Sequence, residues 1–73
     1  MSLPYPTVPT SAARLKHAGW SARESSIHQP SGATVWVVTA SRAGQQVECK
    51  GAIPAEAWHR ACLQVEALGL REW

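Results

Sequence analysis

The sequence predicts an α+β fold. We expect a two-layer domain with the element order α-β-β-β-α, in which a long C-terminal helix and a short N-terminal helix pack on one face of a three-stranded antiparallel meander. Apolar residues recur with a helical period over residues 54–70, whereas residues 33–41 and 45–51 are β-branched or alternate as strands do. The chain has 73 residues, of which 45% are hydrophobic, enough for one small core. We therefore expect a single domain over residues 10–73, after a flexible, proline-rich tail over residues 1–9.

The long helix is the element that the pattern determines best. Its apolar face carries Ala57, Trp58, Ala61, Val65 and Leu68, with Cys62 at the edge. Pro54 suits the first helical position, and Gly69 suits the position just past the end, which gives Leu70 the hydrophobic contact of a Schellman ending. Glu56 precedes Arg60 by four residues, the favourable order for a surface ion pair.

The N-terminal third predicts an extended tail and then a short helix. Alternate prolines in residues 1–9 favour an extended chain, which Tyr5 could anchor. Thr10 is a good N-cap for a helix over residues 11–18. Gly19 then suits the C′ position of a second Schellman ending, with Trp20 directly after it.

Turn lengths predict how the three strands align. Residues 21–28 are weakly strand-like, and a four-residue loop at 29–32 would pair Ile27 with Thr34. A two-residue loop at 43–44 would pair Ala40 with Val47. Both turns then agree on one core face, made of Ile27, Trp36, Val38, Ala40, Val47 and Cys49.

A three-residue second loop is the alternative, and it would place Val35 and Val37 on the face of Val47 and Cys49 instead. We prefer the first solution because it buries Trp36 and satisfies both hairpins. Trp20 and Trp58 also fall at core positions, whereas Trp73 is terminal and is not assigned to the core.

Composition argues against several function classes. The net charge is only +2, too mild to indicate nucleic acid or an anionic membrane as a partner. The sequence has no run of 18 apolar residues and no visible signal peptide in its first ten residues. Two cysteines far apart in sequence do not make a disulfide framework. We expect a reduced, cytoplasmic protein without membrane contact.

The residues that carry chemistry do not form a recognisable set. His59 and Cys62 are three apart on the helix and Cys49 could face them, but zinc usually takes four ligands. The same His–Cys pair lacks a third group to orient the imidazole for nucleophilic catalysis. The sequence contains no Asp, no paired carboxylates and no phosphate-binding glycine loop. We expect no catalytic, cofactor-binding or metal-binding residues.

The outward face of the predicted sheet is the candidate interaction surface. Val35, Val37 and Thr39 follow one another along the central strand, with Glu48 and Lys50 beside them. Glu24, Ser26, His28 and Gln46 complete the predicted polar rim. An apolar stripe in a polar rim suits an unidentified protein partner or a second copy of the chain. The simpler interpretation is the β-propensity of a half-exposed strand.

The order of elements over residues 10–70 resembles that of the double-stranded RNA-binding domain. Members of that family carry basic side chains at the start of the last helix, where they contact phosphate. Here Gly51 to Glu56 contains one acidic and no basic residue. The turn at His28 to Pro30 is only loosely similar to the family's histidine-bearing turn. The resemblance implies a weak nucleic-acid-binding domain as the alternative function.

A second resemblance is closer in sequence. The segments GATVWVV, AWHRAC and LGL are similar to small proteins encoded by proteobacteria and their phages, to which no function is assigned. That resemblance implies an accessory protein of a phage or mobile element. The function we expect is a small, non-catalytic interaction domain that acts through protein–protein contact.

Overall fold

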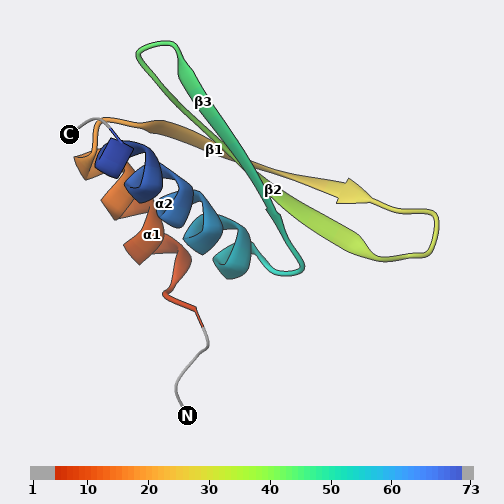
Figure 1. Cartoon of the computed structure of the whole chain (residues 1–73). Helices are drawn as coiled ribbons and strands as arrows, with labels where there is room; N and C mark the ends of the chain where they lie inside the picture. The colour runs from red at the N-terminus through yellow and green to blue at the C-terminus, as the bar shows by residue number, and fades with distance from the viewer. Residues whose placement is uncertain (1–4, 72–73) are drawn as a thin grey trace.

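A computed structural model describes residues 5–71, with side chains described up to Leu68, and confirms the predicted α+β architecture. The elements are α1 (Val8–His17), β1 (Ser21–His28), β2 (Thr34–Arg42), β3 (Gln45–Gly51) and α2 (Pro54–Arg71). The strands form an antiparallel sheet in the order β1-β2-β3. The two helices lie side by side on one face of this strongly twisted sheet (Figure 1).

Helix α1 begins earlier than predicted. Its N-cap is Thr7, whose carbonyl accepts a hydrogen bond from the Ser11 N–H at 3.1 Å, so Thr10 lies inside the helix. Pro9 is also helical, because the first N–H groups of a helix have no partner within it and a proline there loses nothing. The alternate prolines therefore do not keep residues 8 and 9 extended.

The end of α1 follows the prediction. The Trp20 N–H donates to the Leu15 carbonyl at 2.9 Å, and the Gly19 N–H donates to the Lys16 carbonyl at 3.0 Å. These two bonds define a Schellman ending with Gly19 at C′. The ending turns the chain so that both Leu15 and Trp20 enter the core.

Helix α2 begins at Pro54 as predicted, but it does not end at Gly69. The helix continues to Arg71, so the expected Schellman ending is wrong. A glycine inside a helix costs only about 1 kcal/mol relative to alanine, and two good helix formers, Leu70 and Arg71, follow it.

At the start of α2, a Cβ on Gly51 would lie 2.7 Å from the Ala57 nitrogen, so only glycine allows this close approach.

The β2–β3 register is the predicted one. Ala43 (φ 49°) and Gly44 (φ 84°) both have positive φ, which defines a two-residue type I′ turn. Ala40 pairs with Val47 and Val38 pairs with Cys49 as a result.

The β1–β2 register differs from the prediction by one residue. The connecting loop has five residues, 29–33, and the Gln29 N–H donates to the Ala33 carbonyl across its base at 2.8 Å. Ile27 therefore pairs with Val35 and not with Thr34. Since a one-residue shift turns every side chain to the other face, Ile27 lies outside the core and is 49% exposed.

The core lies between the helices and the sheet. Its buried members are Leu15, Trp20, Val38, Ala40, Cys49, Ala57, Trp58, Ala61, Cys62 and Val65. Trp36 and Val47 pack against this cluster, as predicted for their face, while Trp73 lies outside the described residues. The Trp58 indole N–H donates to a Glu24 carboxylate oxygen at 2.8 Å, which satisfies the one polar atom of that ring.

Candidate interaction surface

The outward face is the side of the sheet opposite the helices. Four of the candidate residues lie on this face: Val35 and Thr39 are half-buried, and Glu48 and Lys50 are exposed. Val37 also lies on this face but is only 5% exposed, although it is not part of the core cluster. Both helices lie on the other side of the sheet (Figure 1), so the low exposure of Val37 does not come from helix packing.

Strand β1 contributes a different set of residues to the outward face than predicted. Arg23, Ser25 and Ile27 lie there, because they pair with Thr39, Val37 and Val35 respectively. Glu24, Ser26 and His28 were expected in the rim but lie on the helix-facing side. The observed register places Ile27 beside Val35, which extends the apolar part of the face.

The face changes character along the strands. Ile27 and Val35 form an apolar end. The next cross-strand row carries Lys50 beside Val37, and the row after that places Arg23 and Glu48 on either side of Thr39. The far end is polar and hollowed, with a depression of about 390 Å³ lined by Ser21, Ala22, Arg23, Thr39, Ser41 and Gln46.

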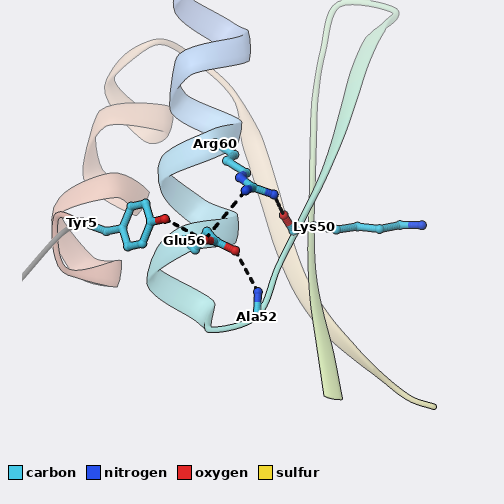
Figure 2. Close-up of polar contacts among 5 residues, drawn as sticks. All are labelled: Tyr5, Lys50, Ala52, Glu56 and Arg60. Carbon is cyan, nitrogen blue, oxygen red and sulfur yellow. Dashed lines mark hydrogen bonds and ion pairs between the residues drawn. The ribbon is translucent and has the colours of Figure 1, made fainter. Parts of the chain in front are cut away.

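A second polar cluster surrounds Glu56 at the start of α2 (Figure 2). One Glu56 oxygen accepts the Tyr5 hydroxyl at 2.7 Å, and the other accepts the Ala52 N–H at 2.9 Å. Arg60 approaches the carboxylate at 3.8 Å, the predicted ion pair, and also donates to the Lys50 carbonyl at 2.9 Å. Figure 2 shows the Lys50 side chain itself pointing away from α2.

These contacts assign a structural role to the Glu56 cluster. The Tyr5 hydroxyl, followed by the Ala52 N–H and Arg60, lowers the pKa of Glu56. The same hydrogen bond raises the pKa of Tyr5. The Glu56 carboxylate already occupies the N-terminus of α2, and Arg60 contacts both Glu56 and the Lys50 carbonyl. Neither the helix N-terminus nor Arg60 is therefore free to bind a phosphate there. The sequence predicts the ion pair and offers Tyr5 as an anchor, but no local pattern links Tyr5 to a residue 51 positions away.

The two thiols lie in the core, on β3 and α2. Cys49 and Cys62 are free and buried, and burial raises the pKa of each. The Cys62 thiol donates to the Ser11 carbonyl at 3.3 Å. His59 is half-buried beside the Tyr5 ring, with 5.7 Å between the ring centroids. Within residues 5–71, no three His, Cys, Asp or Glu side chains gather as metal ligands would.

No protein-family model matches the chain, and neither a curated protein nor a solved structure is significantly similar to it. None of the described helices is long and apolar enough to cross a membrane. A proposal for the function therefore depends on the surfaces of the molecule.

Proposed function

We propose that this chain is a non-catalytic interaction domain that binds a protein partner through the outward face. The observation that carries the proposal is the apolar end of that face. Ile27 is half exposed beside Val35 on a side of the sheet that neither helix covers (Figure 1). Burying these two side chains against a partner would remove apolar surface from water, the dominant favourable term in association.

The charges of the face suit a polypeptide better than a nucleic acid. Arg23 and Lys50 are cationic, but Glu48 lies in the same cross-strand row as Arg23, so it offsets one of the two positive charges. Binding to a phosphate backbone depends on several cations acting together. A protein partner needs only complementary charges around an apolar centre. The partner we expect therefore presents an apolar side chain to Ile27 and Val35, and an acidic group to Lys50.

An accessory role in a phage or mobile element is part of the proposal, on the strength of the sequence resemblance alone. The alternative, weak binding of double-stranded RNA, is disfavoured by the Glu56 cluster. The acidic residue stands where the resembled family has basic groups, and Arg60 is held by Glu56 and by the Lys50 carbonyl.

The chain offers a matched pair of variants for testing the outward face. Ile27 on β1 and Leu63 on α2 are almost equally exposed, at 49% and 51%. We expect Ile27→Glu to abolish capture of the partner from nuclease-treated lysate, and Leu63→Glu to leave it unchanged. A photo-crosslinker at Glu48 should form a protein adduct, whereas one at Gln64, exposed on α2, should not.

Two results would contradict the proposal. Equal capture by both glutamate variants would show that the outward face is not the binding surface. Binding that disappears with nuclease, together with micromolar, salt-sensitive affinity for a duplex of about 20 base pairs, would favour the RNA-binding alternative.

A further inference from the structure

The two edges of the sheet are unlike each other. Along β3, helix α2 packs closely, and Arg60 already donates to the Lys50 carbonyl at 2.9 Å. Strand β1, in contrast, pairs only with β2, and all eight of its residues, Ser21–His28, are exposed. The strand has no proline and its only charged residues are Arg23 and Glu24. It has neither a proline nor a β-bulge that would block a further strand.

The direction of the main-chain groups of β1 follows from the turn. The Gln29 N–H donates to the Ala33 carbonyl, so odd-numbered positions of β1 bond to β2, because bonding alternates along an antiparallel pair. The even-numbered positions turn their N–H and C=O groups away from the sheet; these residues are Ala22, Glu24, Ser26 and His28. Among the turn, cap and side-chain hydrogen bonds of residues 5–71, none reaches the main chain of any of the four.

A row of alternating donors and acceptors is satisfied by another extended strand. We propose that β1 pairs antiparallel with β1 of a second copy of this chain, about a two-fold axis at Ser25, to form a continuous six-stranded sheet. This proposal concerns the edge of the sheet and is independent of the outward face. It uses all four residues whose main-chain groups point away from the sheet, and it forms about eight main-chain hydrogen bonds.

Charge and the length of the strand together select this register among the symmetric ones. An axis at Ser26 would place Ala22 opposite Pro30, which has no N–H to donate. An axis at Glu24 would place two carboxylates directly opposite each other, which destabilises a strand pair. An axis at Ser25 places Glu24 opposite Ser26 of the second copy, and Arg23 opposite Ile27 of the second copy. No like charges then lie directly opposite each other.

The arrangement of the helices leaves room for this pairing. Figure 1 shows that the β1–β2 hairpin projects well beyond both helices, which lie near the start of β1. In an antiparallel pair, the start of β1 in one copy lies beside the end of β1 in the other. The helices of each copy therefore lie beside the helix-free end of its partner.

Amide hydrogen exchange measured by NMR at low and high protein concentration tests the pairing. At a concentration where nine-tenths of the chains are paired, exchange at Ala22, Glu24, Ser26 and His28 should slow about tenfold, because it then requires the monomer. Arg23, Ser25 and Ile27, bonded to β2 in either state, provide the control within the same strand. Fast exchange of the even-numbered amides at every concentration, with a monomeric mass in sedimentation, would overturn the proposal.

A variant pair at Ser26 identifies the edge. Ser26→Pro removes an N–H that no bond within the chain uses and places a ring on the edge, a position where proline is tolerated. We expect Ser26→Pro to sediment as a monomer and Ser26→Ala to remain a dimer. A dimer that persists in a folded Ser26→Pro variant would overturn the pairing through β1. Ile27→Glu should keep the dimer, since Arg23 of the second copy lies opposite, so failure of this proposal and failure of the proposed function are distinguishable.

Discussion

The two faces of β2 carry similar side chains in different surroundings. Val38 and Ala40, on the helix-facing side, are fully buried, whereas Val35 and Thr39, on the outward side, are half-buried. Two helices, the Schellman ending of α1 and the β2–β3 turn all act together on the first face. The residues that β1 adds to the second face depend on the β1–β2 register alone. The core is therefore specified by several local features, whereas the β1 part of the candidate binding surface is specified by one strand alignment.

The largest expected effect is at Trp58, the central indole of the helix-facing side. Trp58→Ala should destabilise the domain by about 3–5 kcal/mol, because it leaves a large cavity and an unpartnered Glu24. Chemical denaturation measures the loss. Trp58→Phe keeps most of the side-chain volume but loses the hydrogen bond to Glu24. Loss of that bond should add about 1 kcal/mol to the cost of the smaller ring. If Trp58→Ala melts cooperatively within a few degrees of the parent, the helix-facing side is not the core.

A matched pair of substitutions on β2 compares the two faces directly. Val38→Thr buries a hydroxyl in the core and should cost about 1–3 kcal/mol. Val35→Thr makes the same change at a half-buried outward position and should stay within about 0.5 kcal/mol of the parent. Both residues are β-branched, so strand propensity changes little in either case. Equal losses in urea denaturation would mean that the outward face is as closely packed as the core.

The smallest effect concerns pH and the Glu56 cluster, at the start of α2. The folded state lowers the pKa of Glu56, chiefly through the Tyr5 hydroxyl, so the contribution of Glu56 to stability is complete above the ordinary glutamate pKa of 4.5. That contribution is lost as the pH falls through the lowered pKa of the folded state. Glu56→Gln should therefore flatten the decline in stability below about pH 5.

Tyr5→Phe is the control for this prediction. It removes the largest cause of the lowered pKa but keeps Ala52 and Arg60, so it should flatten the acid decline only in part. Melting temperatures between about pH 3 and pH 7 measure both variants. An unchanged pH profile in Glu56→Gln would show that the carboxylate is not held in the cluster.

Much of the fold could be predicted from local patterns. The helical face of α2, the Gly19 ending of α1 and the two-residue turn at 43–44 each depend on nearby residues, and each agrees with the structure. The boundaries that failed also have physical reasons. Proline is compatible with the first turn of a helix, so α1 begins earlier than predicted, at Val8. Gly69 is tolerated inside α2 because good helix formers follow it.

The candidate surface was predicted less completely because β1 offers little information. Ile27 is its only large apolar residue, so no hydrophobic alternation identifies which side of β1 faces the helices. Because the loop contains one more residue than predicted, Ala33, every β1 side chain lies on the face opposite to the predicted one. The residues of β2 and β3 were assigned to the correct face because a type I′ turn has a fixed length. The Tyr5–Glu56 contact joins distant segments and left no signal at either residue.

The β1 alignment determines both the outward face and the paired edge, and it can be measured directly. In the structure Ser26 lies opposite Trp36 at a position without mutual main-chain bonds, where opposing Cα atoms are about 4.5 Å apart. This alignment predicts a strong nuclear Overhauser effect between the Hα protons of Ser26 and Trp36. A strong effect between Ser25 and Trp36 would instead indicate the four-residue loop with Ile27 in the core, and would contradict this alignment.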